Sequence, residues 1–554
     1  MIKRNERIEK MVAVGVLIIA ALFMLNRAKY GYIYNDEPFI LTLSHRLIKG
    51  DAFLYDEWQP TQLTGFLNYP WMILFTATHN NTDGMILFFR YIYVVLNFTS
   101  LLFVYLRLSN YSKKPLFTGA ACLYLLLFSS MDILTVSYNF YSLTGLLLFI
   151  TLCITGKSNI EYLFAGIFFS VATLASPYLA IVFVLYYLFF SLNHFVLKKD
   201  ISKNLIDITK MVLFGVILSV VVFICFLYGT GGNISKMLNT VSYIFTDVEY
   251  PSQSIFQLIY GYLYTWVNKF RTFGFMFVVF VMLSLIDKKH KTLWLEAHII
   301  AFVILTPRMI HIFLYQFNYL IMQIGLLGLH ALIIDEQRNN SYSLIAIAGV
   351  IFSFILYATS DLKQYAIANG MILVGFASFF LIDDYLQKHE NNTKLIKTLC
   401  ILLVFAQIGT EVYERMTKYY LDRDINDNLY MIKESVAKGL YVDQEQYDTY
   451  MSICNDINAN IPHHAKLLVL SQEPWIYLMN DSEYCTYSAW MTNSKDFRIK
   501  RLKEYYTLHP DKYPKYIYVL CEDFESEELQ NEFPNFSLIS TDIGYILKNK
   551  DISI

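Results

Sequence analysis

Most side chains that could carry chemistry fall between Tyr34 and Arg90, a carboxylate-rich stretch set between two apolar segments. Asp36 and Glu37 follow the first apolar segment with almost no linker, and Asp56 and Glu57 form a second acidic pair. A carboxylate at the end of such a segment can act as a general base, bind a cation or simply keep a loop hydrated. Because the preceding segment fixes the position of Asp36 and Glu37, we interpret this stretch as an active-site loop.

The composition indicates a membrane protein. Of 554 residues, 56% are hydrophobic and 16% are charged, whereas soluble domains have roughly 45–50% apolar and about 25% charged residues. The formal net charge of −2 argues against a nucleic-acid partner. The seven cysteines show no CxxC or CxxH spacing, so they imply no metal site.

The apolar segments predict a polytopic helical protein. The run from Met11 to about Ala28 can cross the hydrocarbon core, which takes about 20 residues, and the basic residues before it predict a cytoplasmic N-terminus. Twelve further runs bring the predicted spans to thirteen, at about 84–106, 115–131, 138–155, 160–175, 177–196, 206–229, 273–287, 293–309, 311–334, 342–359, 365–384 and 396–413.

The basic residues between these runs support one orientation. Lys and Arg gather in alternate loops, as expected of cytoplasmic loops. The count places the loops 30–83 and 230–271 and the tail outside. We therefore predict a multi-pass protein of the plasma membrane, with a transmembrane module at 1–413 and an extracytoplasmic α/β domain at 414–554.

Both outer loops contain amphipathic patterns. In one, residues 38–49 place apolar side chains on one helical face, and in the other, residues 254–270 carry spaced Tyr, Trp and Phe. These patterns predict helices lying on the membrane, which either border a lipid-facing cleft or simply pack onto the bundle.

The tail has the pattern of a small α/β domain. Residues 443–458 and 498–506 predict helices, 466–471 and 516–520 predict strands, and 536–547 predicts a hairpin. No Gly-rich phosphate loop follows either strand, which argues against nucleotide binding there.

Several short motifs follow one another in the first outer loop: Asp36-Glu37, Leu47 to Asp51, Tyr69-Pro70-Trp71, Asp83-Gly84 and Arg90. In this order they resemble membrane-embedded glycosyltransferases of the GT-C class, among them protein O-mannosyltransferases and the aminoarabinose transferases of lipid A. The resemblance implies a GT-C-like fold, a polyprenyl-phosphate-linked sugar donor, a glycan, lipid or protein acceptor, and Asp36 as the catalytic base with Glu37 beside it. The pattern departs at Asn68-Tyr69-Pro70, where those families often have Lys-Pro-Pro, so the donor phosphate contact is unassigned there.

A sugar on a lipid phosphate departs as a stable anion, so one base suffices and cations must meet the phosphate. Arg90, Arg308 and His311 are the predicted phosphate contacts, and Lys363 is a weaker candidate. Each has an alternative: Arg90 could reach the membrane interface, Arg308 and His311 could tie outer-loop carboxylates, and Lys363 could be a loop charge.

Asp56 and Glu57 either line an acceptor pocket or face water. The outer carboxylates could together bind a divalent cation such as Mg²⁺ or Mn²⁺, although no ligand spacing demands a metal.

Two other function classes remain open. A transporter or flippase of a lipid-linked glycan would place ionisable groups near the bilayer midplane, often in repeated halves. A glycan polymerase or ligase would depend more on Arg and His in large outer loops. The acidic residues here crowd directly after the first span, which favours surface chemistry by a glycosyltransferase.

Overall fold

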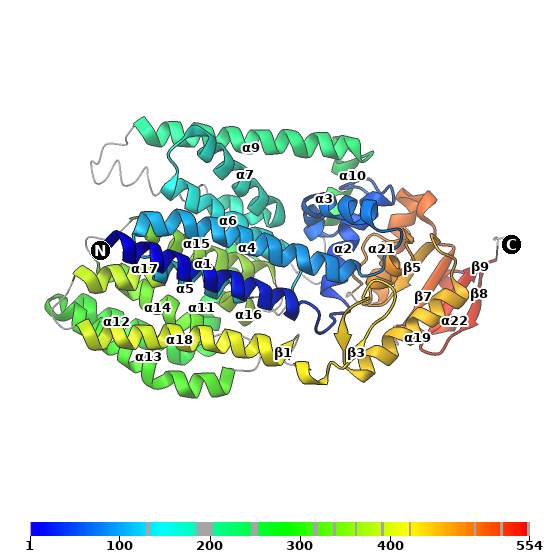
Figure 1. The fold of residues 1–554 in the computed structure, drawn as a ribbon. Coiled ribbons are helices and arrows are strands. Elements are labelled where there is room, and N and C mark those ends of the chain that lie inside the picture. Colours follow the sequence, from blue (N-terminus) through cyan, green and yellow to red (C-terminus); the bar gives the residue numbers. More distant parts are fainter. Residues whose placement is uncertain are drawn as a thin grey trace.

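The computed structural model describes residues 2–128, 133–182, 184, 203–244, 253–313, 320–335, 340–360, 363–388, 393–419, 423–491, 495–520 and 524–550. A helical part comes first in the chain, and a mixed α/β part follows helix α18 and packs against one end of the helices (Figure 1). The predicted fold class, a polytopic helical protein with a C-terminal α/β region, is confirmed.

Helices lie at the predicted apolar runs, apart from 177–196, most of which is outside the described residues. The long helices are α1 (Ile2–Arg27), α4 (Met85–Ser112), α5 (Pro115–Leu127), α6 (Tyr138–Thr155), α7 (Asn159–Ala175), α9 (Lys203–Gly229), α12 (Arg271–Ile286), α13 (Lys291–Phe313), α14 (Leu320–Ile334), α15 (Asn340–Thr359), α17 (Ile372–Lys388) and α18 (Thr393–Thr417), with the short α16 (Gln364–Gly370) before α17.

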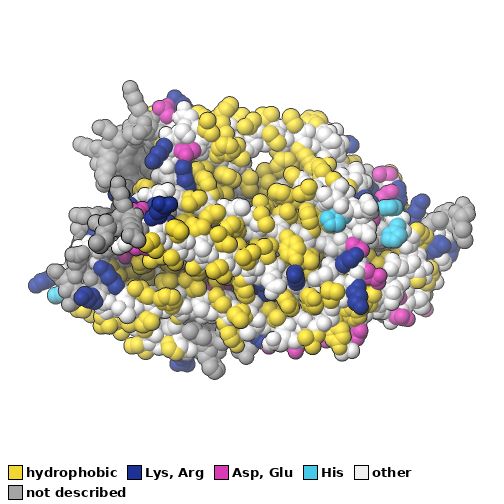
Figure 2. All heavy atoms as spheres, in the orientation of Figure 1, with side chains coloured by type: hydrophobic (Ala, Val, Ile, Leu, Met, Phe, Trp, Pro, Cys, Tyr) yellow, Lys and Arg dark blue, Asp and Glu magenta, His cyan; other side chains and the backbone are white. Residues whose placement is uncertain are grey.

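Six of these helices are long and apolar enough to cross a membrane, and two bent helix pairs raise the number to eight within the described residues. By length and composition, the described residues therefore account for six to eight of the thirteen predicted spans. Several predicted runs form shorter apolar helices of 10–17 described residues, among them Pro115–Leu127, Asn159–Ala175 and Ile321–Ile334. A broad hydrophobic band covers the helical part, with charged side chains gathered toward the two ends (Figure 2).

Close helix contacts depend on glycine at specific positions. Gly166 of α7 and Gly215 of α9 face each other, and a Cβ on Gly166 would lie 2.1 Å from the Val212 carbonyl oxygen. A Cβ on Gly215 would lie 2.2 Å from the Leu163 carbonyl oxygen. Without glycine at both positions the two backbones could not approach this closely.

The first outer loop is mostly helical. It contains α2 (Asp36–Ile48), the short turn η1 (Pro60–Gln62) and α3 (Leu63–Thr78). The predicted helix at 38–49 exists, and its side chains up to Leu47 are all buried, which favours the alternative that this helix packs within the protein over a helix on the membrane surface. Helix α2 packs against α3 and against α20 of the α/β part.

The second outer loop contains α10 (Ile234–Ile244) and α11 (Ile255–Asn268). Helix α11 begins with a capping box, in which the Ser254 side chain and the Gln257 side chain each bind the other residue's backbone N–H. It meets α12 at 95° and leaves Phe256, Tyr260 and Leu263 exposed. This arrangement fits the predicted helix on the membrane surface.

The α/β part is built on a five-stranded sheet of order β6-β5-β7-β9-β8. Strands β5, β6 and β7 are parallel, and β9 runs antiparallel to both β7 and β8. The elements predicted in the tail are all present. They are α19 (Gln444–Asn460), β5 (Lys466–Leu470), α21 (Lys495–Leu508), β7 (Tyr516–Val519), β8 (Phe536–Ser540) and β9 (Tyr545–Asn549), joined by α20 (Trp475–Met479), β6 (Glu483–Tyr484), η7 (Pro510–Lys512) and α22 (Ser526–Glu532).

Candidate active site

Asp36 is the first residue of α2 and is half-buried. The Asn35 side chain accepts a hydrogen bond of 2.8 Å from the Asp36 backbone N–H and so caps the helix. A carboxylate in the first turn also faces the positive end of the helix dipole. Asp36 is therefore held at a rigid helix start, close to the end of α1.

Glu37, the next residue, is fully buried and pairs with Arg90 of α4. The Arg90 Nε donates to Glu37 Oε1 at 2.9 Å, and Nη2 donates to Oε2 at 2.5 Å. Nη1 of Arg90 donates to the carbonyl oxygens of Ala28 at 2.8 Å and Tyr30 at 3.4 Å. This bidentate pair fixes the first turn of α2 to α4 and to the chain leaving α1.

A second buried arginine, Arg46, holds the other end of α2. Its Nε donates to Asp51 at 2.6 Å and its Nη1 donates to Glu57 at 2.5 Å. Its Nη2 donates to the carbonyl oxygens of Asp56 at 2.6 Å and Thr486 at 2.9 Å. Arg46 thus joins the first outer loop to the α/β part through a single guanidinium.

Further ion pairs cross the same interface. Lys512 binds Asp51 at 2.5 Å, and the His509 Nδ1 lies 3.0 Å from Asp56. Asp56 and Glu57 are only 6% and 7% exposed, so the alternative that they face water does not hold. An acceptor-binding role for them stays a prediction.

Asp481 of the α/β part adds a contact to the last turn of α2. The His45 Nε2 lies 2.9 Å from Asp481, and Lys49 binds the same carboxylate at 2.5 Å. The His45 Nδ1 also lies 2.9 Å from the Tyr484 hydroxyl oxygen. The basic side chains at the C-terminal end of α2 therefore meet acceptors on the α/β part.

The second outer loop reaches this interface as well. The Trp58 ring stacks on Tyr243, with ring centroids 4.3 Å apart, and Arg501 of α21 lies over both rings. Thr240 of α10 donates to the Leu54 carbonyl oxygen at 2.9 Å. Two segments far apart in the sequence are thus packed together under the α/β part.

One aromatic residue of the α/β part lies near the start of α2. Trp490 packs on Phe39, with ring centroids 5.2 Å apart. Phe39 is three residues after Asp36, which places the two side chains on neighbouring turns of one helix face. The loop that carries Trp490 is held by Arg46 at Thr486 and by the Trp58 backbone N–H, which donates to the Tyr487 carbonyl oxygen at 2.8 Å.

The other predicted phosphate contacts lie elsewhere. Arg308 is exposed on α13, and the side chain of His311 lies outside the described residues. The Lys363 Nζ donates to the Tyr357 carbonyl oxygen at 3.4 Å. Among the described hydrogen bonds and ion pairs, none joins Arg308 or Lys363 to α2, so the predicted phosphate roles of these residues, and of Arg90, stay predictions.

The described residues contain no group of three or more His, Cys, Asp and Glu side chains placed to hold a metal ion. The buried carboxylates near α2 bind cations of the protein instead: Glu37 binds Arg90, and Asp51 and Glu57 bind Arg46. This set of residues does not fit a Mg²⁺ or Mn²⁺ site.

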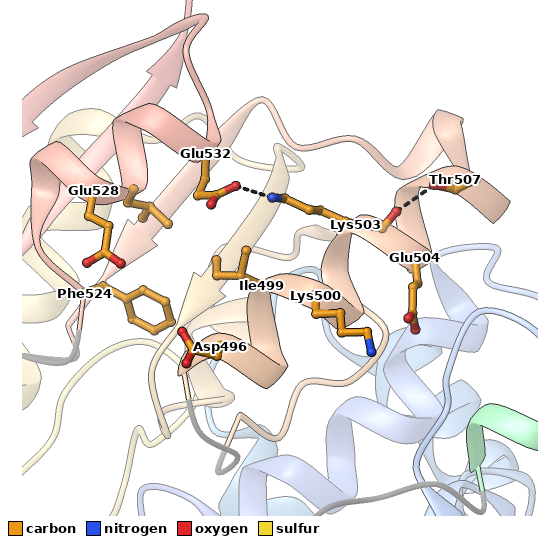
Figure 3. Close-up of a pocket in the computed structure, with 10 residues that line it drawn as sticks. Asp496, Ile499, Lys500, Lys503, Glu504, Thr507, Phe524, Glu528 and Glu532 are labelled. Carbon is orange, nitrogen blue, oxygen red and sulfur yellow. Dashed lines mark hydrogen bonds and ion pairs between the residues drawn. The ribbon is translucent and has the colours of Figure 1, made fainter.

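A cavity of about 40 Å³ lies one turn along α4 from Arg90. Its wall includes Tyr93, Asn97 and Asn139, which make it partly polar. A larger cavity of about 470 Å³ lies between α21 and α22, and Lys500, Glu504 and Phe524 are among its lining residues (Figure 3). Its lining residues come from α21, α22 and Phe524 just before α22, and none of them belongs to the first outer loop.

Sequence reasoning missed Arg46, His45, His509 and Lys512 as partners of the outer-loop acids. One signal was present: Arg46 lies on the same helical face as Leu43 and Leu47, and a buried arginine needs acidic partners. The partners themselves could not be identified, because they are far apart in the sequence. Asp51 and Lys512, for example, are separated by more than 400 residues.

The buried pair of Glu37 and Arg90 predicts that replacing one partner strongly destabilises the folded protein. Glu37→Gln should lower the free energy of unfolding by about 3–5 kcal/mol, because it leaves a buried guanidinium charge without its carboxylate. Denaturant unfolding in detergent of this variant, Arg90→Met and the double variant measures the coupling between them. The control is Glu161→Gln, which breaks the part-exposed pair with Arg107 and should cost about 1 kcal/mol or less. Additive effects of Glu37→Gln and Arg90→Met would contradict the pairing.

The burial of Glu57 predicts that the stability of the folded protein depends on pH. Burial raises the pKa of Glu57 from 4.5 to about 7, and Arg46 only partly opposes this. A carboxyl group with a raised pKa stabilises the folded state below its unfolded pKa and loses that contribution as pH rises to its folded pKa. Glu57→Gln cannot ionise, so its stability relative to wild type should increase between pH 5 and pH 8, by on the order of 3 kcal/mol. Parallel stability curves for the two proteins across this range would rule out the shift.

The chain matches no protein-family profile, and no curated protein is similar to it in sequence. Among solved structures, the oligosaccharyltransferase of Archaeoglobus fulgidus, solved in complex with Zn and sulfate, is similar in the arrangement of its elements. It is 12% identical, the alignment covers 97% of this chain and 74% of that chain, and the TM-score is 0.48.

Proposed function

We propose that the protein is an inverting glycosyltransferase of the plasma membrane that transfers a sugar from a polyprenyl-phosphate donor to a glycan, lipid or protein acceptor. Its N-terminus would be cytoplasmic, and the α/β part and both outer loops would lie outside. The observation that carries the proposal is the placement of Asp36, half-buried at the start of α2, with Glu37 and Arg90 fixing the same turn. The ordered motifs that resemble the GT-C class lie in the loop that this turn begins.

In the proposed reaction Asp36 is the base. Its carboxylate takes the proton from the acceptor hydroxyl as that oxygen attacks the anomeric carbon. The bond between this carbon and the phosphate oxygen breaks on the opposite face, and the polyprenyl phosphate leaves with the electron pair. The configuration at the anomeric carbon is therefore inverted. Because phosphate is a stable leaving anion, the reaction needs no second carboxyl group to protonate it.

The neighbours of Asp36 would act by holding it in place. Glu37 binds Arg90 through both carboxylate oxygens, so this pair fixes the first turn of α2 rather than meeting the acceptor. Phe39 and Trp490 would form an apolar wall beside the carboxylate. Positive charge for the departing phosphate would come from Arg308, His311 or Lys363 if the bound state brings them to the site.

A divalent cation is not needed in this scheme. Glu37, Asp51 and Glu57 already have arginine partners, and no step in the proposed reaction passes through a metal. Removing divalent ions should therefore leave the proton transfer to Asp36 possible.

Asp36→Asn tests the proposal. Purified protein should lose transfer from a polyprenyl-phosphate sugar by at least about 100-fold, because an amide cannot accept the proton. Asp36→Glu should retain part of the activity. The matched control is Glu445→Gln, an exposed acid on α19, which should keep wild-type turnover. Near wild-type turnover of folded Asp36→Asn would remove Asp36 from the role of base.

A further inference from the structure

Helix α18 leaves one apolar stripe exposed along its length. The stripe consists of Leu395, Leu402, Phe405, Tyr413 and Met416, which repeat at three, seven or eight residues and so share a helix face. The helix includes the candidate span Lys394–Thr417, of which only 28% is buried. This face of α18 therefore contacts lipid.

The exposed apolar surface continues past the end of the helix. The turn η6 (Ile425–Asp427) packs back on α18, and the next residues, Leu429, Tyr430 and Met431, are 76%, 41% and 41% exposed. We call Leu429, Tyr430 and Met431 the 429–431 tip. Strand β3 (Tyr430–Met431), which forms most of it, lies just beyond the end of α18 (Figure 1). A soluble surface seldom leaves three adjacent apolar side chains this exposed.

The position of the tip is fixed relative to two span ends. Strand β3 pairs with β4 (Tyr441–Val442), and the Gly31 backbone N–H donates to the Tyr441 carbonyl oxygen at 2.8 Å, just after α1. The Arg27 Nη2 at the end of α1 donates to the Lys418 carbonyl oxygen at 2.8 Å, just after α18. The tip is therefore tied to the level at which both helices leave the hydrocarbon core.

The chemistry of the surrounding residues fits a lipid surface. Tyr430 and Tyr413 are aromatic residues with a polar end, the type enriched at the boundary between lipid and water. The charges nearby in the chain are mixed, because Lys418 pairs with Asp424 at 3.5 Å and Arg423 pairs with Asp443 at 3.8 Å. An apolar tip with an aromatic residue at this height matches the headgroup region better than it matches open water.

We propose that the 429–431 tip, together with Tyr413 and Met416, inserts into the headgroup region of the leaflet next to the α/β part. The bilayer surface is its partner. This contact holds the α/β part against the membrane and fixes its height above the spans. The proposal does not depend on the glycosyltransferase function.

A nitroxide label tests the position of the tip. Leu429→Cys is made in a Cys225→Ser background, because Cys225 is the exposed cysteine among those described, and the Cys225→Ser parent serves as the labelling blank. The matched control is Leu538→Cys on β8, an exposed leucine of the α/β part away from the spans. Power saturation in phospholipid vesicles measures access of oxygen, which concentrates in lipid, and of a water-soluble nickel chelate.

The label at 429 should be several-fold more accessible to oxygen than to the nickel chelate, and the label at 538 should show the reverse. Equal access to the nickel chelate at both positions would overturn the proposal. So would low access to both reagents at 429, which would mean that protein, such as a second copy of the chain, covers the tip. Both substitutions are at exposed positions, so the fold should be retained.

Discussion

A buried guanidinium needs acceptors on every side, and this requirement decides where α2 lies. Arg90 forms an ion pair with Glu37 at the start of the helix, and Arg46 forms ion pairs with Asp51 and Glu57 beyond its end. The first arginine belongs to a long helix of the membrane part, and the second binds a carbonyl oxygen of the α/β part. The helix that begins with Asp36 is therefore fixed from both sides.

These ion pairs specify position more than they add stability. The cost of removing two charges from water offsets most of their attraction, so a buried pair contributes little compared with apolar residues of the same volume. Separating the two partners costs much free energy, because it leaves a buried charge unpaired. Any other position of α2 is therefore unfavourable. For a general base this is useful, because proton transfer requires the carboxylate within hydrogen-bond distance of the acceptor hydroxyl.

The parts of the fold that follow from local pattern could be predicted from the sequence. Apolar runs predicted the positions of the membrane helices. The hydrophobic pattern and the turn residues predicted β5, β7 and the β8–β9 hairpin. The burial of α2 could not be predicted, because its polar side chains find partners far away in the chain, such as Asp481 for His45. Helix α3 lies within 30–83, which is predicted from the sequence as one outer loop, and Pro70 stands inside its apolar run. The role of Asp56 and Glu57 likewise depended on His509 and Arg46, which no local pattern connects to them.

The central claim is that the lipid donor carries its sugar on a single phosphate and that the chemistry takes place beside Asp36. Mass analysis of lipid extracted from protein purified from its native membrane tests this most directly. The account predicts a polyprenyl phosphate bearing one sugar, enriched over the bulk lipid. A polyprenyl diphosphate bearing a finished glycan would contradict it, because that is the cargo of a flippase or the substrate of a polymerase or ligase.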